Sequence, residues 1–494
     1  MKRDLRPHQS LAIERLRHAL GAGKRRPVLQ APTGFGKTRL AAAVIEGALA
    51  KDKRVIFTVP ALSLVDQTVE AFWNDGVRNI GVIQGCHGMT DWSRPVQVAS
   101  VQTLQRRQVL PQADVVIIDE CHRWFDFYPK WMMDPAWQNR PFIGLSATPW
   151  TRGLGRYFDD LIIAATTKDL ITAGYLSPFR VFAPSHPDLT GVRTVAGDYH
   201  EGDLSGVMND STLVADVVDT WLRRAQNRST FCFAVDRAHA KHLQQQFITA
   251  GVSTGYIDAY TPSKEREDIH RKFQDGQIRI VCNVGCLTTG IDWDVRCIIL
   301  ARPTKSEMLF VQIIGRGLRP AEGKEDCLIL DHSDTHLRLG FVTEIHHDIL
   351  DDGRPRANSK SDRIRLPKEC PQCAFLKPPR MRECPACGFE AEAISDIEVA
   401  DGELIEVIGR KKRSDEASKD EKAEFYAQLK GYAQTHGYAS GWAAHKFREK
   451  YDSWPNGYRD VPAMDPTPKV LSWIKSRQIA WAKSKQRHAE QATA

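Results

Sequence analysis

Short apolar runs that alternate with longer segments of helical spacing constrain the fold of this chain more than any other feature. Five such runs lie in residues 1–180, namely RPVLQAP, RVIFTVP, PVQVASV, DVVIIDE and FIGLSAT. Five more lie in residues 230–345, namely TFCFAVD, STGYID, IRIVCNV, VRCIILA and DCLILDH. Apolar strands that are each followed by a helix are typical of parallel sheets covered on both faces. The sequence therefore predicts two α/β domains in tandem, joined near residues 170–182.

The pattern changes after about residue 350, where polar and basic residues replace the apolar runs. We expect six segments: two α/β domains at 1–175 and 176–348, a linker at 349–368, a four-cysteine ribbon at 369–390, a charged linker at 391–422 and a helical module at 423–494. One apolar helix face of that module, which we interpret as core, is formed by Ala443, Phe447, Tyr451 and Trp454. We expect four tryptophans of this module to lie in its core, and the alternative is that they stack on bases: Trp442, Trp454, Trp473 and Trp481.

Residues 31–38, APTGFGKT, nearly match the phosphate-binding loop G-x-x-x-x-G-K-[ST], between a predicted strand and a predicted helix. Ala31 takes the place of the first glycine, which costs little if its φ is negative. Backbone N–H groups of such a loop can surround phosphates. Lys37 can then reach the β- and γ-phosphates, and the Thr38 hydroxyl can bind Mg²⁺. The loop residues predicted to bind the nucleotide are Thr33, Gly34, Phe35, Gly36, Lys37 and Thr38.

A second motif, VVIIDECH at 115–122, is an apolar strand that ends in two acidic residues. An aspartate at the end of a strand is the expected second Mg²⁺ ligand of a phosphate-binding loop, and here it is Asp119. Glu120 beside it can take a proton from an attacking water, which makes it the candidate general base. Cys121 has no activating partner in this motif and is not interpreted as a nucleophile.

With these two motifs the chain resembles superfamily 2 helicases of the DExH type, with a ResIII-type core, over residues 5–345. The resemblance implies that Arg6 and Gln9 of LRPHQ contact adenine. It also implies that TVPALSLVDQ (58–67) and ASVQTL (99–104) contact nucleic acid. Roles in coupling ATP to strand contact are implied for His122 and, in GLSATPW, for Ser146 and Thr148.

The resemblance extends to the second domain, where FAVDRAHA (233–240) is similar to motif IV. CLTTGIDW (286–293) resembles motif V, which implies coupling roles for Thr289 and Gly290 and a nucleotide contact for Asp292. QIIGRGLRP (312–320) resembles motif VI, which implies catalytic roles for Gln312, Arg316 and Arg319. Because charge develops on the γ-phosphoryl group, the two arginines can act across a cleft as arginine fingers, which accelerate phosphoryl transfer by roughly 10³–10⁵.

Two C-x-x-C pairs, Cys370/Cys373 and Cys384/Cys387, predict a tetrahedral structural Zn²⁺ site, because four thiolates leave no open position. A redox pair is the weaker alternative. Lys377, Arg380 and Arg382 between the pairs suit phosphate groups. Whether the ribbon binds DNA or a protein stays open. The remaining seven cysteines are interpreted as reduced thiols of a cytosolic protein.

The net charge of +7 is concentrated in residues 353–494, which hold 26 Lys and Arg against 20 Asp and Glu. This excess favours a polyanionic partner, nucleic acid before membrane, over a merely solvated surface. The sequence has no apolar run long enough for a membrane span and no signal-like start, so we expect a cytoplasmic location. A candidate DNA-facing surface in the tail comprises Lys469, Lys475, Arg477, Lys483, Lys485 and Arg487.

Together these features predict two tandem RecA-like P-loop domains of the α/β class, followed by a small zinc ribbon and a helical module. The predicted activity is an ATP- and Mg²⁺-dependent DNA helicase or translocase. Its tail, with GYASGWAAHKFREKYDSWP after the ribbon, resembles the RadD-like group of bacterial and phage DNA-repair helicases. This implies single-stranded or branched DNA as substrate, work in repair or recombination, and a protein partner for the ribbon or the helical module. The alternatives are the motor subunit of a restriction system, an RNA helicase, and an adaptor whose ATP cycle switches a protein contact.

Overall fold

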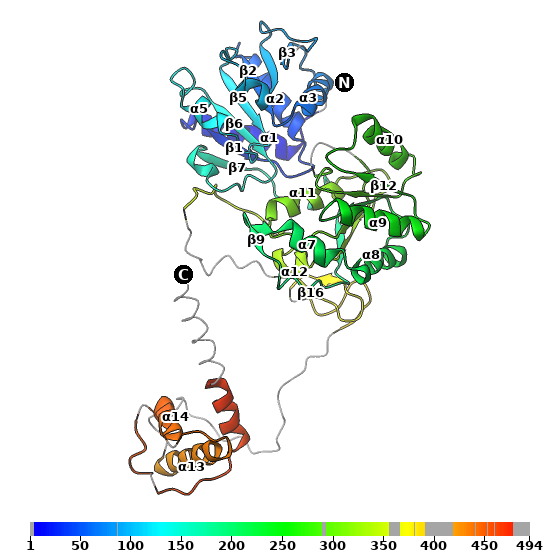
Figure 1. Ribbon diagram of the computed structural model, residues 1–494. Coiled ribbons are helices and arrows are strands. Elements are labelled where there is room, and N and C mark those ends of the chain that lie inside the picture. The colour runs from blue at the N-terminus through cyan, green and yellow to red at the C-terminus, as the bar shows by residue number, and fades with distance from the viewer. Residues whose placement is uncertain are drawn as a thin grey trace. The chain divides into compact units, whose positions relative to one another are not determined.

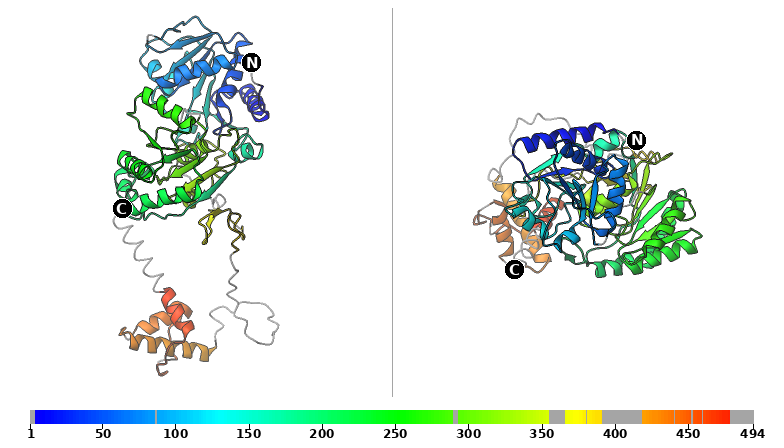
Figure 2. Two further views of the ribbon diagram at one scale, coloured as in Figure 1. Left: turned by 90° about the vertical axis from the view of Figure 1, so that its right-hand side faces the viewer. Right: turned by 90° about the horizontal axis from the view of Figure 1, so that it is seen from above.

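The computed structural model describes residues 4–85, 87–288, 293–354, 366–379, 381–390, 418–439, 441–451, 453–458 and 460–477. It divides into two compact units, Met1–Ala393 and Ile394–Ala494 (Figure 1). The first unit holds two parallel sheets and the four-cysteine segment, and the second is helical. The two predicted RecA-like domains are therefore confirmed as parallel sheets with flanking helices (Figure 1, Figure 2).

The first sheet has seven parallel strands in the order β3-β4-β2-β5-β6-β1-β7. Its strands are β1 (Pro27–Gln30), β2 (Val55–Val59), β3 (Ile80–Ile83), β4 (Val96–Ser100), β5 (Val115–Asp119), β6 (Phe142–Ser146) and β7 (Asp160–Ile163). The associated helices are α1 (Pro7–Gly21), α2 (Lys37–Leu49), η1 (Leu62–Leu64), α3 (Val65–Asn74), α4 (Val101–Gln105), α5 (Phe127–Met133) and η2 (Leu154–Arg156). All five predicted strands are present, and the two that the sequence did not indicate, β3 and β7, form the edges.

The second sheet has six parallel strands in the order β12-β13-β11-β14-β15-β8. Its strands are β8 (Phe179–Phe182), β11 (Thr230–Phe233), β12 (Thr254–Ile257), β13 (Ile280–Asn283), β14 (Cys297–Leu300) and β15 (Cys327–Asp331), and a hairpin is formed by β9 (Thr194–Val195) and β10 (Asp198–Tyr199). Helices in this stretch are α6 (Thr167–Thr172), α7 (Glu201–Met208), α8 (Ser211–Arg224), α9 (Arg237–Thr249), α10 (Ser263–Gln274), α11 (Glu307–Gly317) and α12 (Thr335–Leu339). The unforeseen strand, β8, is again an edge. The exact domain limits remain a prediction.

The four-cysteine segment packs against the second sheet. It contains an antiparallel pair, β16 (Lys368–Glu369) and β17 (Leu376–Lys377). The ring of Phe375 meets that of Phe182 on β8 edge to face, with centroids 5.3 Å apart. Arg224 lies over the Phe182 ring at 4.4 Å and donates a hydrogen bond of 2.9 Å to the carbonyl of Cys373. The segment is therefore part of the first unit.

The second unit contains α13 (Lys419–Thr435), α14 (Trp442–Tyr451) and a helix at 468–477. Its core includes the predicted positions Ala443, Phe447 and Tyr451. Trp454 does not belong to that helix face: it lies beyond the end of α14 and is 43% exposed. Trp481 lies outside the described residues.

A buried carboxylate at the end of β15 is connected to α11 through a histidine. Asp331 is fully buried and accepts hydrogen bonds from the backbone N–H of Ser333 at 2.9 Å and from both the backbone N–H and Nδ1 of His336 at 2.8 Å. The His336 ring in turn meets Phe310 of α11 with centroids 4.7 Å apart. Burial raises the pKa of Asp331, but His336 and Ser333 outweigh burial and lower it to about 2.

We predict that Asp331→Ala lowers the free energy of unfolding by about 3 kcal/mol, because removing one member of a buried hydrogen-bonded pair leaves its partners unsatisfied. A depressed pKa stabilises the fold above the unfolded-state pKa of about 4, so this contribution is lost as the pH falls from about 4 toward 2. Urea denaturation at several pH values measures both effects.

The matched control is Asp219→Ala, which breaks an exposed pair with Arg223 (side chains 59% and 67% exposed) and should cost less than about 1 kcal/mol. Equal losses in the two variants would contradict the structural role of Asp331.

Candidate active site

The predicted phosphate-binding loop lies between β1 and α2, as its motif requires. Gly34 and Gly36 both have φ of +84°, a left-handed conformation that favours glycine. A β-carbon on Gly36 would lie 2.4 Å from Nε2 of Gln9, so a larger residue there would displace the Gln9 side chain. Ala31 is fully buried and keeps a negative φ. The condition for replacing the first glycine of the motif is therefore met.

Arg6 and Gln9, at the start of α1, brace this loop. Nε2 of Gln9 donates to the carbonyls of Phe35 at 2.9 Å and Gly36 at 3.2 Å, while its Oε1 accepts from the N–H of Arg6 at 2.9 Å. Arg6 also donates to the carbonyl of Gly34 at 3.1 Å. These contacts hold the loop directly, and contact with adenine stays a prediction.

The guanidinium of Arg6 lies over the ring of Tyr175 at 4.8 Å, and the ring of His8 lies 4.8 Å from that of Tyr175. His8 also lies 3.2 Å from the carbonyl of Phe35 through Nε2. Neither residue was predicted from the sequence. His8 could have been noticed inside LRPHQ, whereas nothing in the sequence around Tyr175 marks it.

Lys37, Asp119 and Glu120 come together at the carboxyl end of β5. Nζ of Lys37 forms an ion pair with Oε1 of Glu120 and lies 4.0 Å from Oδ1 of Asp119. Glu120 has φ of 48°, a left-handed conformation that costs of order 1–3 kcal/mol in a residue other than glycine. Such strain is concentrated at functional sites. Thr38 follows Lys37 in the first turn of α2 and is exposed.

Burial and mutual charge shift the pKa values of these groups. Burial raises the pKa of Asp119 to about 6, against the opposing charge of Lys37. Burial also favours a raised pKa for Glu120, but Lys37 and His122 hold the pKa of its carboxyl well below the usual range. For Lys37, burial is outweighed by Glu120 and Asp119, which raise its pKa. Lys37 and Glu120 are thus both charged at neutral pH. Cys121 is fully buried, and burial raises its thiol pKa, which agrees with a non-nucleophilic role.

A hydrogen-bonded chain leads from Glu120 to the second sheet's α11. Nδ1 of His122 lies 3.2 Å from Oε2 of Glu120 and 2.9 Å from Oγ of Ser146. Ser146 Oγ accepts from the N–H of Thr148 at 3.0 Å. Nε2 of Gln312, on α11, lies 3.1 Å from both Nε2 of His122 and Oγ1 of Thr148. The structure therefore brings together four residues from three separate sequence motifs.

Further along α11, Gly315 and Arg316 reach the phosphate-binding loop. A β-carbon on Gly315 would lie 2.6 Å from Oγ1 of Thr33, so α11 and the loop are in close contact. Arg316 is buried and near enough to Lys37 to disfavour its charge. Arg319 lies two residues past the end of α11, where its carbonyl accepts from Nζ of Lys324 at 2.6 Å. Thr289, Gly290 and Asp292 lie outside the described residues.

Residues 347–353, most of which were assigned to a linker, contact the loop that follows β6. Asp351 accepts from the N–H of Gly155 at 2.7 Å through its carbonyl and from the N–H of Gly153 at 2.9 Å through its carboxylate. Nε2 of His347 pairs with Glu307 of α11 at 2.7 Å, and the His347 ring lies 4.8 Å from that of Trp150. This segment therefore forms a second connection between the first sheet's domain, at the loop after β6, and α11 of the second.

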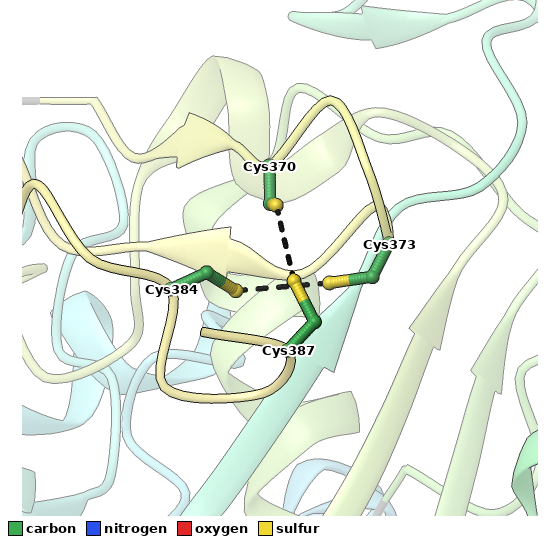
Figure 3. Close-up of side chains that lie close together, drawn as sticks. All are labelled: Cys370, Cys373, Cys384 and Cys387. Atoms are coloured by element: carbon green, nitrogen blue, oxygen red, sulfur yellow. Dashed lines mark hydrogen bonds between the residues drawn. The ribbon is translucent and has the colours of Figure 1, made fainter. Parts of the chain in front are cut away.

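The four cysteines of the ribbon converge (Figure 3). Their sulfur atoms all lie within 4.8 Å of one another, with 3.7 Å between the Cys370 and Cys387 sulfurs and 3.7 Å between the Cys373 and Cys384 sulfurs. A tetrahedral Zn²⁺ with Zn–S bonds of about 2.3 Å requires S–S separations of about 3.8 Å, so this set fits zinc. The four residues are free cysteines, not disulfides.

Each cysteine pair is followed by a residue in the left-handed conformation, Ala374 (φ 58°) and Gly388 (φ 71°). The expectation that Lys377 contacts phosphate is wrong, because its side chain is buried and donates to the carbonyl of Arg382 at 2.8 Å. Packing of β17 inside the unit explains the difference. Arg380 lies outside the described residues.

Models of known protein families match the sequence in the regions of both sheets. A family model described as "Type III restriction enzyme, res subunit" matches residues 2–151, and one described as "Helicase conserved C-terminal domain" matches residues 213–321. Among curated proteins, a 51.5 kDa protein of a Lactococcus phage (isolate 7-9) is 26% identical over 378 residues, which cover 74% of this chain and 78% of that protein.

Two further relatives are matched over smaller shares of their own length. The putative ATP-dependent helicase IRC3 of Saccharomyces cerevisiae is 33% identical over 252 residues, 48% of this chain and 37% of that protein. The Type I restriction enzyme EcoAI endonuclease subunit of Escherichia coli is 28% identical over 403 residues, 71% of this chain and 48% of that protein. Among solved structures, a fragment of a putative HsdR subunit of a type I restriction enzyme from Vibrio vulnificus YJ016 shares the fold. Its TM-score is 0.53 at 23% identity, covering 70% of this chain and 68% of that chain.

The two family matches and the two parallel sheets support a superfamily 2 helicase core. The relatives support an ATP-dependent helicase motor with ATP hydrolase activity. Within the described parts of the chain, no helix is both long and apolar enough to cross a membrane.

We predict that Lys37→Ala and Glu120→Gln each abolish ATP hydrolysis, with a loss of about 10²–10⁴-fold for the missing base in Glu120→Gln. Glu120→Gln should keep its affinity for ATP, because it removes a proton acceptor and leaves the phosphate contacts intact. Lys37→Ala should bind ATP more weakly. Steady-state turnover and fluorescent-nucleotide binding measure the two effects, and turnover near the wild-type rate in either variant would refute the assignment.

For the ribbon we predict a single bound zinc per chain by elemental analysis, and its loss in Cys370→Ser because three thiolates cannot complete the tetrahedron. Cys286→Ser, at a half-buried cysteine outside the ribbon, is the control and should keep the metal. Wild-type protein that contains no zinc after purification without chelator would count against the site.

Proposed function

We propose that this chain is an ATP- and Mg²⁺-dependent DNA translocase or helicase. The observation that carries the proposal is the contact of Gln312 with His122 and Thr148, 3.1 Å in each case. This contact connects the residues around Glu120 to a helix from the other parallel sheet. Nucleotide chemistry at the loop and movement of one sheet against the other can therefore be coupled.

In the proposed mechanism the Lys37–Glu120 ion pair separates when ATP binds. Lys37 then contacts the β- and γ-phosphates, and Glu120, relieved of its cationic partner, becomes a stronger base for the attacking water. Thr38 and Asp119 offer the oxygen atoms that Mg²⁺ prefers, and the metal would neutralise charge on the phosphates. Of the two candidate arginine fingers, Arg316 is the one on α11, the helix that touches the loop through Gly315.

DNA, as the partner, is supported by the basic excess of residues 353–494 and by the resemblance of the tail to RadD-like helicases. We propose work on single-stranded or branched intermediates of repair or recombination. In this proposal the ribbon is a structural Zn²⁺ site attached to the second sheet through Phe375 and Arg224. A protein partner for the ribbon or the helical module remains part of the proposal.

The motor subunit of a restriction system is the second candidate. It is favoured by the match of residues 2–151 to the restriction family and by relatives among type I restriction subunits. Cleavage of circular plasmid DNA by this chain with ATP and Mg²⁺, alone or with a partner subunit, would support it over the repair proposal.

The test is the steady-state ATPase rate without nucleic acid and with single-stranded DNA, forked DNA or RNA at one fixed salt concentration. We expect strong stimulation by DNA and less by RNA. Displacement of a labelled strand from the forked substrate then separates a helicase from a translocase. Stimulation by RNA alone would replace the DNA proposal with an RNA helicase, and no stimulation by any of the three would favour an ATP-switched adaptor.

A further inference from the structure

Four aromatic rings with nearly parallel planes belong to residues 432–442, at the end of α13 and the start of α14. Figure 1 labels these two helices of the second unit. The centroids of Tyr432 and His436 are 4.0 Å apart at 21°, those of Tyr438 and Trp442 are 4.7 Å apart at 16°, and those of Tyr432 and Trp442 are 5.6 Å apart at 29°. We call these four residues the aromatic platform. Its rings are arranged like stacked bases.

The aromatic platform borders the core of the same unit, against which Tyr432 and Trp442 pack, but its ring geometry differs from that of the core. In the core, Phe425 meets Tyr451 at 87° and Trp473 at 81°, the edge-to-face geometry of packed rings. The platform rings are parallel and partly in solvent: Tyr438 is 40% exposed, His436 is exposed, and the other two are half-buried. A ring that is partly exposed to solvent can stack with a further flat ring.

Aromatic and basic groups continue along α14 beyond the platform. His445 lies one helical turn after Trp442 and therefore on the same side of the helix. The ring of His445 lies 5.1 Å from that of Trp454, and the guanidinium of Arg448 lies 4.8 Å over Trp454. Trp454 lies beyond the end of α14 and is 43% exposed, so a second accessible ring follows the platform in the chain.

The charge of this surface suits a polyanion. Residues 425–448 contain Lys430, Lys446 and Arg448 and no Asp or Glu. Arg448, His436 and His445 are exposed. Lys446 pairs with Glu449 at 2.5 Å, an acidic residue just past the end of this segment. Flat rings interspersed with cations are the arrangement by which proteins bind single strands without reading their sequence.

We propose that the aromatic platform binds single-stranded nucleic acid by stacking on its bases, with Lys446 and Arg448 contacting the phosphates. This surface belongs to the unit that does not contain the ATP site, so the inference goes beyond the proposed motor function and does not depend on it. An acidic peptide would satisfy the cations, but the parallel orientation of four rings favours planar bases over aliphatic side chains.

The test uses the full-length chain and fluorescence anisotropy with a labelled oligothymidylate of about 16 nucleotides, beside an abasic strand of the same length that has phosphates but no bases. We expect wild-type protein to bind the oligothymidylate more tightly than the abasic strand. Tyr438→Ala should lose about tenfold in affinity for the oligothymidylate and little for the abasic strand. Tyr438→Phe, which keeps the ring, should bind as wild type.

Two further measurements separate stacking from charge and from unfolding. Tyr438→Ala should weaken binding by the same factor at every salt concentration, whereas Lys446→Ala should reduce the slope of affinity against salt, because it removes a phosphate contact. Leu471→Ala, at another exposed apolar residue of the same unit (41% exposed), is the matched control and should bind as wild type.

Wild-type affinity in Tyr438→Ala, or an equal loss on the abasic strand, would overturn the proposal, as would a loss shared by Leu471→Ala. Loss of binding to an acidic, Phe-containing peptide with oligothymidylate binding unchanged would assign the platform to a protein partner instead. Basal ATP hydrolysis should be unchanged in Tyr438→Ala. If DNA does not stimulate ATP hydrolysis by the wild type but Tyr438→Ala still weakens oligothymidylate binding, the motor proposal is wrong and the platform proposal is retained.

Discussion

The amide of Gln312 joins the two parallel sheets at the point where nucleotide chemistry is expected, and the remaining geometry of the site depends on this contact. It reaches His122 and Thr148 together, and His122 in turn lies 3.2 Å from Glu120. Gly315, one turn further along α11, touches Thr33 of the phosphate-binding loop because it lacks a β-carbon. A shift of α11 would therefore be felt both by the candidate base and by the loop. The fully buried Asp331–His336 pair contacts α11 through the ring of Phe310.

Most of the two-sheet core could be predicted, because the same sequence motifs mark both its strands and its candidate site residues. Buried parallel strands are apolar over most of their length, so β5 and β15 stand out in the sequence although each ends in an aspartate. Three of the four edge strands, β3, β7 and β8, were missed, whereas the fourth, β12, was predicted from STGYID. The φ of 48° at Glu120 and the ring of Tyr175 under Arg6 left no mark in the sequence. Both are set by tertiary packing.

The tail was less predictable, for reasons that particular residues make clear. Lys377 was expected to bind phosphate, but packing of the ribbon on the second sheet buries it. Trp454 was counted on a helix face, yet Pro455 disfavours helical backbone in the residue before it, and α14 ends at Tyr451. The four cysteines were found by spacing alone, and their sulfurs do converge at distances that suit zinc. The parallel orientation of the rings near Tyr438 could not be foreseen, because it depends on how α14 is oriented after the turn that ends α13.

The central claim, that one ATP site is assembled from both sheets, is tested most directly by single-turnover hydrolysis in Arg316→Ala with saturating single-stranded DNA. Nucleotide affinity is measured in parallel to show that the phosphate-binding loop is intact. The account predicts that Arg316→Ala binds ATP nearly as well as wild type but hydrolyses it about 10³-fold more slowly, the loss expected for an arginine finger. Hydrolysis at the wild-type rate would contradict the account, because the first sheet's domain would then be sufficient by itself.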